Sequence, residues 1–186
     1  HMAKTYVSRA GVKLEEALNH FGINVTDKVC MDVGAATGGF TDCLLQHGAT
    51  QVYAVETGYG VLDWKLRNDP RVVVKERSNI LYSLDIPRDI DLAVVDTSWT
   101  KLKLSVPATS RFVKPKGIIL ALIKPQYEID KKLLVKGIVP EEELPKILES
   151  VKTQMQDLGF IPSEIIDSPI TGEAGNREYW IKLMLK

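Results

Sequence analysis

Residues 32–40 have the sequence DVGAATGGF, a pattern suited to holding a nucleotide-like cofactor. The segment follows a short apolar run and precedes an amphipathic stretch at 41–47, so we expect a strand, a glycine-rich turn and a helix. Gly34 and Gly38 allow a sharp turn and a close approach of the backbone to a ligand, where a Cβ atom would intrude. The first N–H groups of the helix would then face a negatively charged ligand atom. The predicted contacts to the cofactor come from Asp32, Gly34, Ala35, Ala36, Thr37, Gly38, Gly39 and Phe40.

A second acidic residue, Glu56, ends the next predicted strand, 22 residues after Gly34. An acid at this distance commonly bonds ribose hydroxyls. NAD and S-adenosylmethionine (SAM) both carry such a ribose, so Glu56 leaves both cofactors open. The Gly-x-x-x-Gly-Gly spacing favours SAM over a dinucleotide, because Asp32 would lie badly beside a pyrophosphate but suits an ammonium group. We also include Asn79 and Asp96, after the third and fourth strands, in the cofactor site. The alternative is that the glycines and Asp32 only shape a tight turn.

The hydrophobic pattern predicts strands and helices in alternation. We expect strands at 29–33, 51–55, 72–75, 91–95, 117–123, 162–167 and 179–185, and helices at 9–21, 41–47 and 141–158. The last two strands follow one another without a helix, which indicates an antiparallel final strand. The predicted fold is one doubly wound α/β domain over residues 1–186, with a mostly parallel seven-stranded sheet and helices on both faces. The first two residues, His1 and Met2, are interpreted as a remnant of expression.

Charge is balanced overall but unevenly distributed, with 24 basic and 24 acidic side chains in 186 residues. Segment 99–136 has nine Lys/Arg and two Asp/Glu residues, as in many nucleic-acid binders, although such lysines also simply solvate loops. Cys30 and Cys43 indicate small core residues of a reduced, cytoplasmic protein. No apolar run approaches the roughly 20 residues that span a bilayer, and no residues have metal-ligand spacing. We therefore expect neither membrane association nor a bound metal.

Six motifs, in order along nearly the whole chain, resemble one protein family. They are YVSRAGVKLEEAL at 6–18, DVGAATGGFTDCLLQHGA at 32–49, VYAVETGYGVLDWKLR at 52–67, VVDTSW at 94–99, LIKPQYE at 122–128 and GNREYW at 175–180. On these motifs the chain is similar to the methyltransferase domain of the TlyA (hemolysin A) group of FtsJ-like ribosomal RNA 2′-O-methyltransferases. The resemblance implies a Rossmann-like fold, SAM as methyl donor, and ribosomal RNA or ribosomal subunits as partner. The family more often has aspartate where Glu56 stands, and it carries an S4-type RNA-binding domain that this chain is expected to lack.

The resemblance also implies a catalytic Lys-Asp-Lys-Glu quartet, whose counterparts are Lys13, Asp96, Lys124 and Glu178. Strand direction agrees for three of them. Asp96 and Lys124 follow neighbouring parallel strands, and Glu178 precedes a strand of opposite direction, so all three belong at one sheet edge. Lys13 reaches this edge only if the first helix packs across it. Lys124 is the predicted base that removes the ribose proton, with a pKa lowered by burial and by the charge of Lys13.

RNA is expected to contact Arg9, Trp99, Lys101, Lys103, Lys131 and Lys132. Trp99 either stacks on the target nucleoside or packs at the edge of the site. Methylation of a base fits less well, because 96–99 lacks the two prolines of amino-methyltransferases and neither cysteine lies where a cytosine-C5 enzyme needs one. Two other functions stay open: a non-catalytic RNA- or ribosome-binding module with the same fold and, with least support, a membrane-active hemolysin.

Overall fold

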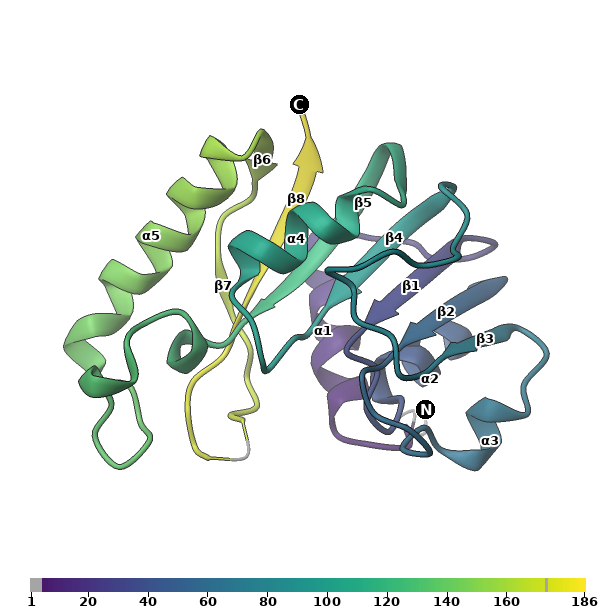
Figure 1. The fold of residues 1–186 in the computed structure, drawn as a ribbon, viewed down its shortest axis with the longest axis horizontal. Helices are drawn as coiled ribbons and strands as arrows, with labels where there is room; N and C mark the ends of the chain where they lie inside the picture. Colours follow the sequence, from purple (N-terminus) through teal and green to yellow (C-terminus); the bar gives the residue numbers. More distant parts are fainter. Residues whose placement is uncertain (1–4, 173) are drawn as a thin grey trace.

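A computed structural model describes residues 5–172 and 174–186, so the interpretation of His1 and Met2 lies outside the described residues. One twisted sheet forms the middle layer, with helices on both sides (Figure 1). Its order is β3-β2-β1-β4-β5-β8-β6, and β7 also pairs with β8. The strands are β1 (Val29–Val33), β2 (Gln51–Val55), β3 (Val72–Lys75), β4 (Ile90–Val95), β5 (Val113–Ile123), β6 (Phe160–Pro162), β7 (Ile166–Asp167) and β8 (Tyr179–Leu185). The predicted fold is confirmed, including the antiparallel pairing of β8 with β5.

The sheet differs from the prediction at two places. The strand expected at 162–167 is split into β6 and β7, which gives eight strands instead of seven. The split falls at Ser163, whose hydroxyl accepts a hydrogen bond from the backbone N–H of Lys182 at 2.9 Å and so replaces a backbone carbonyl of the ladder. β5 begins four residues earlier than expected, and its pairing with β4 shifts in register between Ile90 and Leu92.

Helices cover both faces of the sheet. They are α1 (Ala10–Phe21), α2 (Gly39–Gln46), α3 (Trp64–Arg67), α4 (Leu102–Ser110) and α5 (Leu144–Asp157), with 3-10 turns η1 (Pro125–Tyr127), η2 (Lys131–Leu133) and η3 (Glu141–Glu143). Helices α1 and α2 pack on one face, and α4 and α5 on the other (Figure 1). α1 ends where sequence predicts, because Gly22 adopts the left-handed conformation with a φ of 64°. Among the described residues, no helix is long and apolar enough to cross a membrane.

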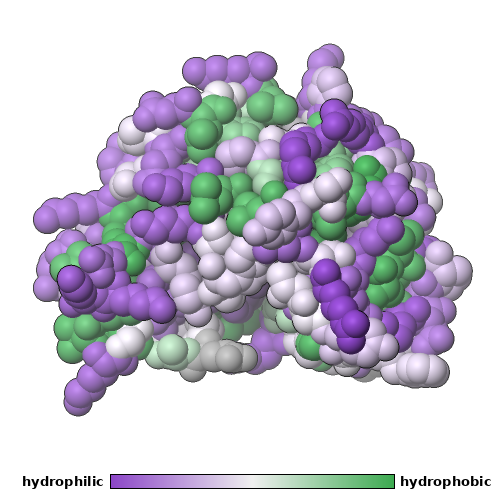
Figure 2. Space-filling view, viewed as in Figure 1, coloured by the Kyte–Doolittle hydropathy of each residue, from purple (hydrophilic) through white to green (hydrophobic). Residues whose placement is uncertain are grey.

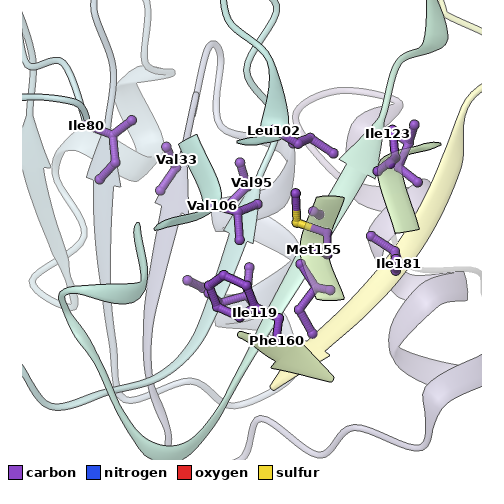
Figure 3. Close-up of a cluster of buried hydrophobic side chains, with 14 of the residues drawn as sticks. Val33, Ile80, Val95, Leu102, Val106, Ile119, Ile123, Met155, Phe160 and Ile181 are labelled. Atoms are coloured by element: carbon purple, nitrogen blue, oxygen red, sulfur yellow. The ribbon is translucent and has the colours of Figure 1, made fainter. Parts of the chain in front are cut away.

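Two hydrophobic clusters, one on each face, hold the layers together. Successive strand side chains point to opposite faces, so Val33 and Val95 contribute to the cluster under α4 and α5 (Figure 3). Val94 packs with α1 and α2 instead. In the helix expected at 141–158, apolar side chains recur at helical spacing up to Leu158. Met155 is 0% exposed, but Leu158, just after α5, is 44% exposed. The apolar face of α5 therefore ends one turn before the sequence pattern does.

We predict that Met155→Ala lowers the free energy of unfolding by about 2–5 kcal/mol, because it leaves a cavity between α5 and the sheet. Leu158→Ala is the control and should lower it by less than about 1 kcal/mol, since that side chain is half exposed. Urea titration of the two variants measures both values. Equal losses in the two variants would contradict this description of the core.

Candidate active site

The carboxyl ends of the parallel strands bring the predicted site residues to one edge of the sheet. The strand pairings place Glu56 after β2, Gly34 after β1 and Asp96 after β4 side by side. Two residues further along β5, Lys124 follows the strand opposite Glu178, which precedes β8. This edge is the lower one in Figure 1, and the space-filling view shows a notch there (Figure 2). β1 and β4 are neighbours although β2 and β3 lie between them in sequence. Their ends therefore form the topological switch point, where ligands bind in such sheets.

The glycine-rich loop passes very close to the loop after β4. Gly34 has a φ of 88°, and a Cβ atom built on it would lie 2.0 Å from the backbone oxygen of Asp96. The N–H groups of Gly34 and Ala35 both donate to the carbonyl of Val55, at 2.9 and 3.0 Å. The loop is thus tied to β2 on one side and pressed against Asp96 on the other. Only glycine fits at its first position.

Gly38 makes the second sharp turn of the loop and starts α2. Its φ is 104°, and a Cβ atom there would lie 2.3 Å from Cδ1 of Leu66. No side chain caps the N-terminus of α2. The first N–H groups of the helix therefore keep the positive end of the helix dipole available at the loop, as the sequence predicts.

Glu56 holds the loop from the opposite side. Its carboxylate accepts a hydrogen bond from the N–H of Ala36 at 2.9 Å and another from the N–H of Gly58 at 2.7 Å. Ala36 has a positive φ of 49°, which this contact helps to fix. Asn79 lies in the adjacent loop, where Ser78 donates its N–H to the carbonyl of Glu56 at 3.0 Å. The structure thus brings Ala36, Glu56 and Asn79 together around one loop.

Asp32 lies beneath the loop and is fully buried. One carboxylate oxygen, Oδ2, accepts the hydroxyl of Thr41 at 2.8 Å, whereas Oδ1 has no hydrogen-bond partner. Burial raises the pKa of Asp32 to about 7, and the nearby carboxylates of Asp96 and Glu56 add to the effect, while the Thr41 bond opposes it. Asp32 therefore supports the loop from below, and the carboxylates that reach the surface are those of Glu56 and Asp96. Thr41, which follows the glycines by two residues, was not among the predicted site residues.

The four residues of the quartet meet as two ion pairs. Lys13 Nζ lies 2.7 Å from Glu178 Oε1, and the two side chains are 12% and 2% exposed. Lys124 Nζ lies 2.7 Å from Asp96 Oδ1, and these side chains are 16% and 19% exposed. Helix α1 therefore does cross the edge, as the predicted site requires. Lys124 also donates to the hydroxyl of Ser98 at 3.0 Å, a contact that sequence analysis did not anticipate.

The pKa of Lys124 departs from the predicted direction. Burial alone lowers it, but the carboxylates of Asp96 and Glu178 outweigh burial, so the pKa lies above its usual value. The prediction was wrong for the free protein because Lys13 does not act on Lys124 as an unpaired charge. Its ammonium group is instead held by Glu178. Lys124 is therefore protonated at neutral pH.

The predicted RNA contacts are exposed at or beside this edge. Trp99 and Lys101 lie in the loop after β4, Lys131 is in η2 after β5, and Arg9 precedes α1. The other two predicted residues are also exposed, Lys103 at the start of α4 and Lys132 in η2. Segment 99–136 does not form one basic surface, however. Its strand β5 starts at the opposite edge, where Lys114 pairs with Asp91.

The chemistry of the edge fits SAM. Glu56 can accept ribose hydroxyls, the uncapped N-terminus of α2 suits a carboxylate, and the carboxylates of Asp32 and Asp96 suit positive charge. The buried Oδ1 of Asp32 accepts no hydrogen bond from the described residues, which fits a site that takes a hydrogen-bond donor from a ligand. Among the described residues, no group of three or more His, Cys, Asp or Glu side chains could hold a metal ion.

A doubly wound sheet with a glycine-rich first loop and lysine–carboxylate pairs beside it has the architecture of a SAM-dependent methyltransferase. The chain belongs to the FtsJ-like methyltransferase family, which matches it over residues 6–184. It is 43% identical to YqxC of Bacillus subtilis over 96% of this chain and 65% of that protein. It is 40% identical to a Mycobacterium tuberculosis protein named 16S/23S rRNA (cytidine-2′-O)-methyltransferase TlyA, over 97% of this chain and 69% of that protein. The chain thus spans about two thirds of the length of these relatives.

Solved structures agree with this family. A protein from Streptococcus thermophilus has a TM-score of 0.92 and 40% sequence identity, and the match covers 100% of this chain and 69% of that one. SAM-dependent methyltransferases with 13 and 16% identity share the fold, with TM-scores of 0.68 and 0.67. The predicted family is confirmed, and SAM is the cofactor that this family uses.

The buried carboxyl group of Asp32 predicts an unusual pH dependence of stability. Because its folded-state pKa lies near 7, well above the ordinary 3.8, the unfolded chain loses this proton first as the pH rises. Titration of Asp32 should therefore lower the free energy of unfolding between about pH 4 and 7, and its contribution should stay constant above pH 7. Between pH 5 and 8, the free energy of unfolding of the unaltered protein should fall by about 3 kcal/mol more than that of Asp32→Asn, which has no carboxyl group to titrate at this position. Urea titrations of both proteins test this; a constant difference would mean that Asp32 is already ionised at pH 5.

Proposed function

We propose that this domain transfers the methyl group of SAM to the 2′-hydroxyl of a ribose in ribosomal RNA. Two ion pairs carry the proposal, Lys124–Asp96 and Lys13–Glu178. Both lie at the topological switch point beside the glycine-rich loop. The name of the 40% identical TlyA protein supports ribosomal RNA and ribose as target. Ribosomes are cytoplasmic in bacteria, so the domain would act in the cytoplasm.

The reaction needs a base for the ribose hydroxyl. A hydroxyl group becomes a useful nucleophile only as its proton leaves, and general-base catalysis typically contributes about 10²–10⁴-fold. Bound SAM supplies an electrophilic methyl group on a sulfonium. In the proposed step the O2′–CH₃ bond forms as the S–CH₃ bond breaks, and the hydroxyl proton passes to Nζ of Lys124. Lys124 must therefore be neutral at the start of the step.

The contacts of Lys124 explain how it could reach that state. In the free protein its proton is held chiefly by Asp96, against the opposing effect of burial. A positively charged ligand beside Asp96 would share this carboxylate and weaken its hold on the lysine. Burial, the largest single influence on Lys124, would then lower its pKa. Donor binding thus favours the neutral amine at the place where the acceptor arrives.

Lys13 limits how strongly Glu178 opposes this change. Glu178 is nearly fully buried and lies beside Lys124 across the β5–β8 pairing, so an unpaired carboxylate would hold the lysine proton strongly. The 2.7 Å contact with Lys13 offsets part of this charge, although Glu178 still raises the pKa of Lys124. We propose that Lys13 and Glu178 act as a compensated pair that sets the charge around Lys124, while Asp96 and Lys124 face the substrate.

The exposed residues around the edge give RNA a place to bind. Lys101 lies on the loop that follows β4 and Lys131 lies in η2 after β5, and both are exposed and can contact phosphates. Trp99 is 43% exposed on the same loop as Ser98, which suits stacking on an unpaired base better than burial in the core. These positions support ribosomal RNA or a ribosomal subunit as the partner.

We expect the domain to bind SAM, and Glu56→Gln to weaken binding about tenfold by removing the charge that accepts ribose hydroxyls. Isothermal titration calorimetry with SAM measures this directly. Glu149→Gln, an exposed acid on α5, is the matched control and should bind like the unaltered protein. No heat at millimolar SAM would contradict catalysis and would favour the non-catalytic RNA-binding module.

We expect Lys124→Ala to lose at least about 100-fold in methyl transfer, because the base is removed. Lys124→Arg should be equally inactive, since it can keep a charged contact with Asp96 but cannot give up its proton. Lys146→Ala, an exposed lysine on α5, should leave the rate unchanged. The assay uses labelled SAM with ribosomal RNA or subunits, followed by digestion to nucleosides. Label on a base, or full activity of either Lys124 variant, would contradict the mechanism.

A further inference from the structure

Ser98 makes the second polar contact of the proposed base. Its hydroxyl oxygen lies 3.0 Å from Lys124 Nζ, and the carboxylate of Asp96 lies 2.7 Å from the same nitrogen. The side chain of Ser98 is exposed, whereas Thr97 before it is buried. Ser98 is therefore a surface hydroxyl whose polar contact points to the reactive amine rather than into the core.

The loop that carries Ser98 is fixed at both ends. On one side, the hydroxyl of Thr97 donates to Ser105 at 3.3 Å. On the other, the N–H of Leu102 donates to the carboxylate of Glu128 at 3.1 Å. Glu128 follows η1, which itself begins directly after Lys124, so this contact joins the Ser98 loop to the Lys124 segment. Ser98 is consequently held in place relative to Lys124 although it is exposed.

The geometry of an amine makes these two contacts informative. A protonated lysine has three N–H bonds, of which one is directed to Asp96 and one to Ser98. When the third proton leaves, both remaining N–H bonds can stay with these acceptors. The lone pair must then occupy the one tetrahedral position that is left. Without Ser98, the amine can rotate about its Cε–Nζ bond while it keeps its contact with Asp96.

We infer that Ser98 is a positioning residue that, together with Asp96, aims the lone pair of Lys124 at the ribose hydroxyl. The inference rests on the proposed function and extends it, because it gives Asp96 and Ser98 separate tasks. Asp96 is the main influence on the charge of the lysine, whereas Ser98 sets the direction of its lone pair and adds a smaller contribution that favours the charged form. The groups facing Lys124 are then Asp96 from β4, Ser98 from the loop after it, Tyr127 from η1, and Glu178 paired with Lys13.

Kinetics of Ser98→Ala test this role. We expect kcat for ribose methylation to fall about 10- to 100-fold, with KM for RNA and the affinity for SAM unchanged. Ser98→Thr keeps the hydroxyl and should restore most of the rate. Ser150→Ala is the matched control, because Ser150 also accepts an N–H at 3.0 Å, from Gln154 on α5, away from the site. A rise in KM alone would show that Ser98 contacts RNA and would overturn the positioning role.

The pH profile separates positioning from a general loss of structure. The hydroxyl favours the charged form of Lys124, so Ser98→Ala should move the rising limb of kcat to lower pH while it lowers the plateau. NMR titration of the Lys124 amine should show the same downward shift without any substrate. An unchanged titration, or an unchanged plateau, would overturn the inference. If the unaltered protein transfers no methyl group to ribose, the proposed function fails and this inference fails with it.

Discussion

The contact between Gly34 and Asp96 joins the two halves of this molecule. Gly34 follows β1, Asp96 follows β4, and the two backbones are so close that a Cβ atom on Gly34 would lie 2.0 Å from the carbonyl oxygen of Asp96. The glycine-rich loop and the uncapped start of α2 lie on one side of the contact. The lysines and their carboxylates lie on the other. Because packed backbones cannot give way as side chains can, this approach fixes the distance between the donor loop and the proposed base.

Charge compensation is the second constraint, and it follows from burial. Glu178 and Lys13 are almost buried, so each needs a partner of opposite charge. Their pairing leaves Asp96 and Lys124, which are somewhat more exposed, as the pair that ligands can reach. Removing one member of the inner pair would leave a buried charge and disturb the outer one. The arrangement explains why four ionisable residues at one edge are tolerated in a folded protein.

The amino-acid sequence was sufficient to predict the features that depend on local residue pattern and on the direction of the strands. Gly34, Gly38 and Glu56 were placed correctly because a glycine-rich turn after a buried strand has few other meanings. The position of Lys13 depended on the packing of α1 across the sheet edge, for which the resemblance to a family was needed. The division of the basic segment between two edges was missed, because charge counts ignore that β5 spans the sheet and carries Lys114 to the far side. Ser98 was missed because a serine in an exposed loop has no distinguishing pattern, and only coordinates show that it meets Lys124.

Asp96 occupies the position at which these constraints meet. Its backbone carbonyl touches the donor loop at Gly34, and its side chain holds the proton of Lys124. Any change in charge or position on the donor side therefore reaches the base through one residue rather than through a chain of contacts. The raised pKa of Lys124 then has a simple reason, since the carboxylate of Asp96 holds its proton. A base that becomes neutral only beside a bound donor would be ready only when the methyl group is present, and coupling through Asp96 would produce that order without a moving domain.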